Sequence, residues 1–365
     1  MRCDSFHTRG LLVLYCLLLL GCRNGGDRYS QPRFSDKREV SVEIIAGPLP
    51  FTMASAIEVT GPYLVAMAAD VMDHSFCHIF DKSGQLLCNT LREGRGPGEL
   101  LALEGNLSVR NGRVEFLDRL TKTMFSFDVD SLLMALSSGL SAPIESYSVF
   151  SLLKAEDYRN DFHDMTLVHQ KISPRMVESG EEMRRLSVFD DLGNLVSRFD
   201  SFAEEDEWKN WADTYHFSIS PDGTKLAVVP TWSGTLELFD LPGLTPIYVG
   251  YFAPQEFESP SGSVSLTEKS AIQFSDIVSS DKEVYAVWGG DVAFLPNREL
   301  PEELQAIPAN KIDVFDWKGK PVKQIITDYR VHRVCLDESA GCLYAIVSDK
   351  EESYYLGRIV LTRAN

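Results

Sequence analysis

The chain of 365 residues lacks clusters of basic residues and, beyond its N-terminus, long apolar runs. It has 35 Lys and Arg against 53 Asp and Glu, which gives a formal net charge of −18. Nucleic-acid binding relies on clustered Lys and Arg that release counterions from phosphates, so this balance argues against a nucleic-acid partner. After residue 22, no stretch reaches the roughly 18 apolar residues of a membrane-spanning helix. A soluble, acidic body is therefore expected.

The motifs of several common enzyme classes are also missing. The sequence contains no G-x-x-x-x-G-K-[ST], no H-E-x-x-H and no G-x-S-x-G, so nothing indicates a phosphate loop, a zinc peptidase or an α/β-hydrolase. His74 and His78 have a helical ligand spacing, but in the expected strand they are about 13 Å apart. The sequence thus predicts no catalytic residue, no metal site and no cofactor, and calcium enters only as an alternative below.

The one long apolar run is at the N-terminus. Its ten residues, 11–20, follow Arg2 and Arg9. A helix of this length is too short to span about 30 Å of hydrocarbon, but the pattern is typical of a signal peptide. The run ends in Leu-Leu-Gly-Cys, residues 19–22, which resembles the bacterial lipobox.

In proteins with a lipobox, the cysteine is diacylated and becomes the new N-terminus. The resemblance implies a signal peptide over residues 1–21 and a lipid anchor on Cys22, with an ordinary cleaved signal as the alternative. It places the exported protein in the bacterial cell envelope, with the outer membrane favoured and the membrane as partner through the anchor. Residues 22–39 are polar and read as a flexible tether, and residues 40–365 form the folded body.

Four cysteines remain after the signal and the anchor are assigned. In two expected hairpins Cys77 faces Cys88, and Cys335 faces Cys342. Both pairs are compatible with cross-strand disulfides in an exported protein. The favoured alternative is that all four are small apolar strand residues without a bridge.

Two kinds of hairpin alternate along the chain, and each is a strand, a turn with Gly or Asp, and a second strand. The first kind ends its leading strand in Phe-Asp and occurs at 77–87, 186–196, 236–249 and 312–325, with a looser copy at 124–133. The second kind occurs at 56–68, 107–118, 217–229, 274–288 and 334–347. Two consecutive hairpins make a four-stranded antiparallel sheet.

A four-stranded sheet that recurs every 40 to 50 residues or so is the blade of a β-propeller. We therefore predict an all-β fold, a six-bladed β-propeller, with five or seven blades as competing counts. One blade cannot bury its two apolar faces alone, whereas neighbours stacked around a ring bury both. The early strand at 40–47 is expected to pair beside the last blade and close the ring.

These repeats also resemble known propeller families. Residues 94–128 resemble an NHL-type repeat, and residues 217–229 resemble the Ser-Pro-Asp-Gly repeat of TolB-type propellers. With the lipobox, the whole mature chain is similar to the TolB-like six-bladed propeller lipoproteins of Bacteroidetes. That resemblance implies the fold and no settled activity, because propellers host many unrelated functions.

The glycine-rich stretch at 94–100 precedes a strand and not a helix, so it lacks the helix N-terminus that attracts phosphate. We interpret it as a tight connector between two blades. Gly94, Gly96 or Gly98 can take the positive φ angle of such a passage, and Glu99 is expected to bond a neighbouring backbone group or Arg95.

Long insertions between the hairpins are the predicted place of a binding site: 155–165, 201–216, 251–270 and 289–310. In the second, Trp208 and Trp211 stand beside carboxylates and His216, a composition typical of sugar stacking. The alternative is a short amphipathic turn packed on its blade. Trp288 and Asp291 are further candidates near the central channel, although strand packing explains Trp288 equally well.

Three functions are open at this point. The favoured one is a non-enzymatic binding module for a glycan, a peptide or a partner protein. The second is a hydrolase with a channel site, either lactonase-like and calcium-dependent or a glycosidase, with Asp276 and Asp313 as candidate carboxylates. The third is a purely structural docking subunit of an envelope complex, which would show a flat apolar patch.

Overall fold

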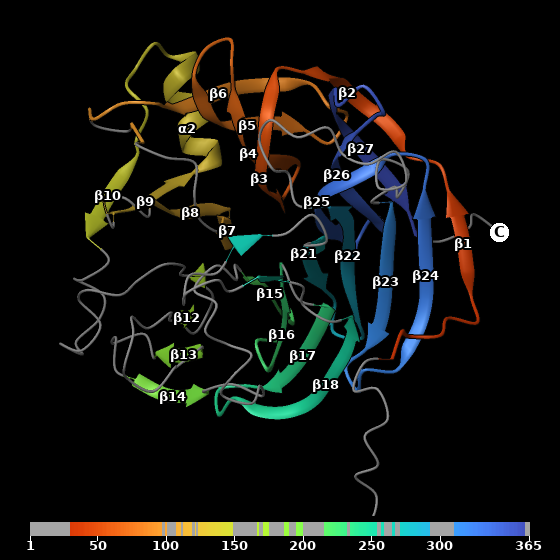
Figure 1. The fold of residues 1–365 in the computed structure, drawn as a ribbon. Coiled ribbons are helices and arrows are strands. Elements are labelled where there is room, and N and C mark those ends of the chain that lie inside the picture. The colour runs from red at the N-terminus through yellow and green to blue at the C-terminus, as the bar shows by residue number, and fades with distance from the viewer. Residues whose placement is uncertain are drawn as a thin grey trace, which may run out of the picture.

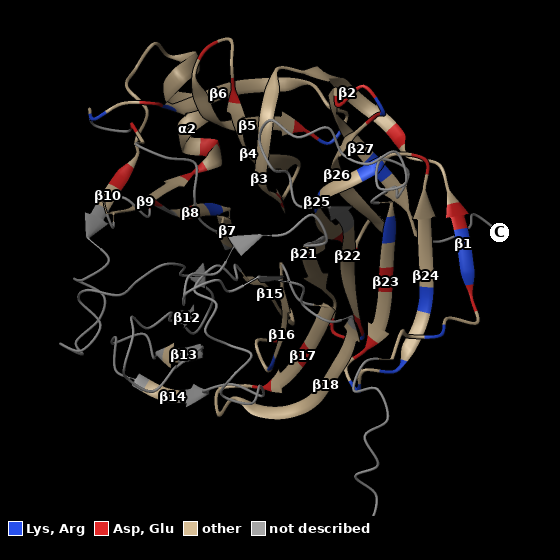
Figure 2. Cartoon of the chain, viewed as in Figure 1, with Lys and Arg blue, Asp and Glu red and all other residues tan. Residues whose placement is uncertain are grey.

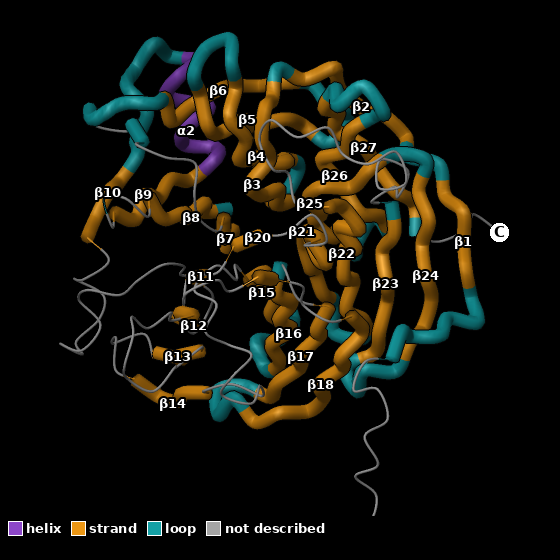
Figure 3. Tube along the Cα trace, in the orientation of Figure 1, coloured by secondary structure: helices purple, strands orange, loops and turns teal. Residues whose placement is uncertain are grey.

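The computed structural model describes residues 30–96, 99, 100, 107–110, 112–118, 121, 123–148, 166, 167, 171–174, 186–189, 195–199, 215–231, 234–253, 257, 258, 265, 266, 271–292 and 310–361. Within them, strands dominate, and one helix, α2 (Val129–Ser137), lies at the edge of the molecule (Figure 3). No helix in this part of the chain is long and apolar enough to cross a membrane. Cys22 and residues 1–21, the predicted signal peptide, lie outside the described residues.

The described strands form five four-stranded sheets and one five-stranded sheet, set around a common axis (Figure 1). These are six propeller blades, as predicted, each named here by its order along the chain. Blade 1 contains β3 (Phe51–Thr60), β4 (Tyr63–Asp70), β5 (Ser75–Asp81) and β6 (Leu86–Arg92). Blade 2 contains β7 (Leu107–Arg110), β8 (Arg113–Asp118), β9 (Thr123–Asp128) and β10 (Glu145–Ser148). Blade 3 contains β11 (Thr166–Leu167), β12 (Lys171–Pro174), β13 (Leu186–Phe189) and β14 (Leu195–Phe199).

The remaining blades follow the same order. Blade 4 contains β15 (Tyr215–Ile219), β16 (Lys225–Pro230), β17 (Gly234–Asp240) and β18 (Thr245–Ala253). Blade 5 contains β21 (Ala271–Ser279), β22 (Glu283–Val292), β23 (Lys311–Asp316), β24 (Pro321–Thr327) and, outermost, β1 (Lys37–Val40). Blade 6 contains β25 (Arg330–Asp337), β26 (Cys342–Ser348), β27 (Tyr354–Val360) and β2 (Glu43–Leu49). A two-stranded hairpin of β19 (Phe257–Glu258) and β20 (Ser265–Leu266) lies in sequence between blades 4 and 5.

The first strand of each blade is its inner strand, nearest the axis. Inner strands of successive blades contact one another: β3 contacts β7 and β25, and β21 contacts β15 and β25. Apolar side chains fill the space between the blades behind them. One such cluster joins blade 6 to blade 1 and includes Leu64, Ala66, Ile346 and Leu356, all fully buried. Burial of both faces of every blade is what makes the closed ring stable.

The Phe-Asp pairs that revealed the repeat end the third strands of the blades. Their aromatic rings are among the largest fully buried side chains of the described residues: Phe80, Phe127, Phe239 and Phe315. The aspartate that follows closes the turn, since Asp81 Oδ1 accepts the backbone N–H groups of Ser83 and Gln85, each at 2.9 Å. The motif therefore combines a core anchor with a turn that the sequence specifies locally.

The chain's N-terminal strands close the ring, which confirms the expectation for residues 40–47. Strand β2 pairs antiparallel with β27, with Glu43 opposite Arg358, and supplies the fourth strand of blade 6. Strand β1 pairs parallel with β24 and widens blade 5. Because β2 comes from one end of the chain and β27 from the other, this pairing joins the first and last segments of the body.

The four cysteines of the body are free thiols in the structure. The pairing register gives the reason: Cys77 is opposite Thr90, whereas Cys88 is opposite Ile79. Cys335 and Cys342 are likewise offset, because Cys335 is opposite Tyr344. Diagonal neighbours on an antiparallel pair are about 7–8 Å apart, too far for a disulfide without backbone movement. The two disulfides considered above, Cys77–Cys88 and Cys335–Cys342, are therefore not formed.

The glycine-rich stretch connects blade 1 to blade 2, as expected. Glu99 accepts the N–H of Gly96 through Oε2 at 2.5 Å, and Gly94 donates its N–H to the carbonyl of Leu100 at 2.9 Å. Gly94 and Gly96 do not have the positive φ, and Gly98, the third candidate for it, lies outside the described residues. Close approach is the reason for glycine instead, since a Cβ on Gly94 would lie 2.0 Å from the Glu99 carboxylate.

Candidate ligand-binding cavity

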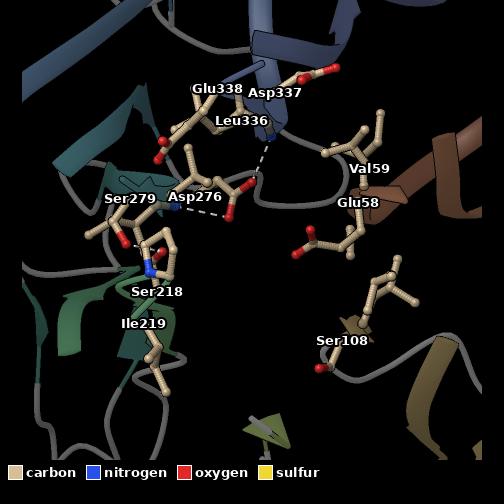
Figure 4. Close-up of a pocket in the computed structure, with 18 of the residues that line it drawn as sticks. Glu58, Val59, Ser108, Ser218, Ile219, Asp276, Ser279, Leu336, Asp337 and Glu338 are labelled. Carbon is tan, nitrogen blue, oxygen red and sulfur yellow. Dashed lines mark hydrogen bonds between the residues drawn. The ribbon is translucent and has the colours of Figure 1, made fainter. Parts of the chain in front are cut away.

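A cavity of about 640 Å³ lies on the axis of the propeller (Figure 4). Five inner strands line it: β3, β7, β15, β21 and β25. Aliphatic side chains such as Ile57, Ile219 and Val278 form part of the wall, and polar side chains project between them. The cavity is therefore a joint product of five blades, and no single repeat contains it.

The propeller has two faces, one at each end of its axis. The cavity lies toward the face at which the first and third strands of each blade end. Its lining includes turn residues that follow such strands, among them Gly61, Lys82 and Pro221. Strands alternate in direction within a blade, so second and fourth strands end at the opposite face.

The described strands that precede the four long insertions are second or fourth strands of their blades, so these strands end at the opposite face. Residues 200–214, for example, follow β14 in the sequence and precede β15, and residues 293–309 follow β22 and precede β23. Of the predicted site in the second insertion, His216 lies at the start of β15 and lines the cavity. Most of the insertion residues lie outside the described residues, including Trp208 and Trp211.

Glu58 of β3 projects into the cavity (Figure 4). Desolvation, reinforced by the nearby charge of Asp276, raises the pKa of Glu58 to about 8, against a small opposing effect of the Val59 N–H. The carboxyl group is consequently protonated at neutral pH and can donate as well as accept a hydrogen bond.

Asp276 of β21 projects into the same cavity from a different wall. Its Oδ2 accepts the N–H of Val334 at 2.8 Å, and its Oδ1 accepts the N–H of Ile277 at 2.9 Å. Burial raises the pKa of Asp276 to about 6, although the charge of Arg333 and these two N–H groups act in the opposite direction. Asp276 is therefore mostly ionised at neutral pH, whereas Glu58 is mostly protonated.

His216 is the second predicted residue, after Asp276, that the structure places in this cavity. Its Nε2 is 3.3 Å from Thr231 Oγ1, and its Nδ1 is 3.9 Å from Asp276 Oδ1. Burial, together with Arg333, lowers the pKa of His216 well below its usual value, so the ring is neutral. The contact with Asp276 is for that reason not an ion pair. Beside them, the hydroxyl groups of Ser218 and Ser279 are 2.8 Å apart.

The rim of the cavity carries an ion pair between two blades. Lys82 Nζ, from the turn of blade 1, lies 2.5 Å from Asp337 Oδ2 of blade 6. Asp337 is buried, and its neighbour Glu338 is exposed and also lines the cavity. Figure 2 shows acidic and basic residues scattered over the described strands.

Three other predicted residues, Trp288, Asp291 and Asp313, are not part of the cavity lining. Trp288 of β22 packs edge-on against Phe274, with ring centroids 5.1 Å apart, so the packing interpretation holds for it. Asp291, also in β22, pairs opposite Ile272. Asp313 lies in the third strand of blade 5, where its Oδ1 accepts a hydrogen bond from Gln324 at 2.8 Å. Its proposed place in the channel is therefore wrong.

Glu58 and Arg333 are the residues that sequence reasoning missed. Each is a charged residue flanked by apolar residues in an inner strand, in Ala-Ile-Glu-Val-Thr and in Val-His-Arg-Val-Cys. That interruption is the signal that points to them, because a charge in a buried strand needs a partner or a function. Among the described residues, no group of three or more His, Cys, Asp or Glu side chains is arranged to hold a metal ion.

Comparisons with known proteins agree with this fold. A family model described as TolB-like 6-blade propeller-like matches residues 34–339. A member of the DUF4221 family from Bacteroides vulgatus is similar with a TM-score of 0.50 and 9% identity, over 90% of this chain and 97% of its own. The calcium-binding protein regucalcin from Agrobacterium tumefaciens has a TM-score of 0.50 and 10% identity, over 89% and 96%.

A Bacteroides fragilis protein described as exported has a TM-score of 0.48 and 11% identity, over 90% of this chain and 99% of its own. At such identities, these likenesses show the fold alone. No curated protein sequence matches the chain.

Proposed function

The chain belongs to the TolB-like 6-blade propeller-like family, and from this premise we propose that it is a lipid-anchored binding protein whose central cavity holds a small polar ligand. The propeller fold suits a binding or structural module, and the cavity gives that module a defined site. Small-molecule sites in proteins are concave, about 300–1,000 Å³ in volume, and combine apolar walls with a few polar groups. The cavity of about 640 Å³ has these properties.

The observation that carries the proposal is the convergence of polar groups from separate blades. Glu58 comes from blade 1, His216 and Ser218 from blade 4, and Asp276 and Ser279 from blade 5. Unpaired polar groups in a poorly solvated space cost free energy. Polar side chains from three blades converge on one concave space with aliphatic walls, which is the composition of a small-molecule site, so this arrangement favours a ligand.

The location in the cell envelope rests on the N-terminal sequence. The lipobox-like residues 19–22 would leave Cys22 with acyl chains, and the tether would hold the propeller near the membrane surface. Incorporation of an alkyne-labelled fatty acid in expressing bacteria tests this. Wild type should be labelled and Cys22→Ala should not, and equal labelling would refute the anchor.

Ligand binding is tested with the full-length protein purified in detergent. Titration calorimetry against sugars, amino acids, small peptides and amines should find a ligand that binds wild type. Ser108→Phe places a bulky ring in the cavity and should abolish that binding, whereas Ser83→Phe on an exposed turn should not. A ligand that binds both variants equally would place the site elsewhere, for example in the insertions. Binding of a large glycan or a partner protein alone would favour the docking alternative.

A hydrolase is the second candidate, and one observation favours it. Glu58 and Asp276 share the cavity and have pKa values of about 8 and about 6, so one is an acid while the other is a base at pH 7. Such a pair suits general acid–base hydrolysis. Turnover of aryl glycosides or lactones that Glu58→Gln abolishes would establish this function over simple binding.

A further inference from the structure

We propose that the ligand of the central cavity carries a positively charged amino group, which binds to the carboxylate of Glu58. This inference rests on the proposed function and specifies the chemical class of the ligand. It follows from the charges of the cavity wall and from the partners that each charge already has.

The lining of the cavity has more carboxyl groups than cations. Its carboxyl groups are Glu58, Asp276, Asp337 and Glu338, and Lys82 is the cation among the described residues that line it. Lys82 is already bound to Asp337 at 2.5 Å. No described cation of the wall is therefore left for Glu58, and an anionic ligand would meet carboxyl groups on several sides.

Glu58 differs from Asp276 in its partners. Asp276 accepts two backbone N–H groups and lies in the field of Arg333. For Glu58 the groups that act on the side chain are the Val59 N–H and Asp276, which has the same charge sign. A poorly solvated carboxyl group without a cation is costly in its ionised form, and a ligand ammonium group would supply the missing partner.

The groups that surround Glu58 define the pH dependence. Asp276 of β21 and His216 of β15 face the same cavity, and from β25 the guanidinium of Arg333 and the buried thiol of Cys335 lie behind it. His216 is neutral, and Arg333 acts on Asp276. With pKa values of about 8 and about 6, Glu58 and Asp276 both change their charge between pH 5 and pH 9. Asp276 is mostly ionised above pH 7, so the titration of Glu58 dominates the pH dependence between pH 7 and pH 9.

Amine binding must therefore release a proton. Below pH 8 free Glu58 is protonated, because its pKa is about 8. An ammonium ion favours the ionised form, so binding at pH 7 should release close to one proton. The affinity should rise as the pH increases toward 8 and then level off. A neutral ligand that hydrogen-bonds to the protonated carboxyl group would show the opposite trend.

The experiment compares two sets of probes matched in size. One set is putrescine, 1,4-butanediol and succinate, and the other is glucosamine, glucose and glucuronate. Titration calorimetry of the full-length protein in detergent, in two buffers of different ionisation enthalpy, gives affinity and proton release together. We expect at least one cationic probe to bind more than about tenfold tighter than its neutral and anionic counterparts, as a charge-assisted hydrogen bond implies.

The variants separate this contact from a general effect on the cavity. Glu58→Gln keeps the shape of the protonated side chain and should weaken binding of the cationic probe more than about tenfold, with loss of the proton release. Glu351→Gln, on an exposed turn, should change neither.

Equal binding of neutral and cationic probes, or an undiminished affinity of Glu58→Gln, would overturn the amine proposal. So would the absence of binding by both cationic probes. If Ser108→Phe still blocked some neutral or anionic ligand, the cavity would keep its proposed function while the amine class failed. Binding unaffected by Ser108→Phe would instead refute the cavity as the site.

Discussion

The Nε of Arg333 donates a hydrogen bond of 2.6 Å to the carbonyl oxygen of Ser55, and this bond joins the inner strand of blade 6 to that of blade 1. The same guanidinium uses Nη1 to donate to the carbonyl oxygens of Ser275 in blade 5 and of its neighbour His332. One side chain thus links three adjacent inner strands around the axis. Where the ring closes, the hydrogen bonds of Arg333 join the blades near the axis, and the pairing of β2 with β27 joins the two ends of the chain at the outer edge.

Arg333→Met should lower the free energy of unfolding by about 2–4 kcal/mol, because it leaves carbonyl groups and the buried Asp276 without their donor or counter-charge. Denaturation in urea at pH 7 measures this. Arg38→Met is the control, since Arg38 forms an exposed ion pair with Asp36 at 2.6 Å and its loss should cost less than about 1 kcal/mol. Equal losses in the two variants would contradict a special role of Arg333.

Gly357→Ala should weaken the closure of the ring. A Cβ at this position of β27 would lie 2.3 Å from Val42 Cγ1, at the entry to β2. Overpacking of this kind costs about 1–3 kcal/mol. We expect a lower melting temperature and faster proteolytic release of the segment before residue 50. At Gly243, a Cβ would meet its nearest atom, Thr245 Oγ1, at 3.4 Å, so Gly243→Ala is the matched control and should change little.

The architecture was accessible from the sequence because its determinants are local. Each Phe-Asp pair lies at the end of the third strand of its blade. Phe80 and Asp81 show what the pair does: the ring of Phe80 is buried, and the carboxylate of Asp81 closes the turn that follows. Closure by the N-terminal strand followed from counting strands. Gly94 lacks a positive φ, and the close approach of the Glu99 carboxylate, 2.0 Å from where a Cβ would stand, is a tertiary contact that the local sequence does not show.

The cavity was less accessible, because it exists only where five inner strands meet. Glu58 and Asp276 are far apart in sequence, and nothing local to either shows that both face the axis. Trp288 was attractive as an aromatic residue beside glycines, but β22 is a second strand, which directs the ring onto Phe274 and not into the cavity. Whether a side chain reaches the cavity depends on the position of its strand within the blade, and the residue type alone does not show that position.

Glu58→Gln should stabilise the unliganded protein at pH 8 and have little effect near pH 4. The pKa of Glu58 is raised from 4.5 to about 8 in the folded state, so the folded protein holds a proton that the unfolded chain releases between these values. The stability of wild type therefore falls as the pH rises through this window, while the variant lacks that contribution. We expect a difference on the order of 4 kcal/mol at pH 8, measured by denaturation at several pH values.

Removal of a carboxylate elsewhere provides the comparison for this effect. Glu351→Gln removes an exposed carboxylate and should give a curve of stability against pH parallel to that of wild type. If Glu58→Gln also ran parallel to wild type, the carboxyl group of Glu58 would be solvated in the apo protein. The amine proposal would then lose its energetic basis.

His332→Gln should make the protein more resistant to acid. His332 Nε2 lies 2.8 Å from Ser348 Oγ, and burial, aided by Arg330 and Arg333, lowers the pKa of His332 from 6.5 to about 3. Between these pH values the unfolded chain takes up a proton that the folded protein refuses, so the stability of wild type falls as the pH decreases below 6.5. The glutamine amide can keep the bond to Ser348 without this titration. Relative to wild type, the variant should therefore gain about 1–2 kcal/mol between pH 7 and pH 5 in urea denaturation. Identical changes in both proteins over that interval would mean that His332 is protonated in the folded state, in spite of its two arginine neighbours.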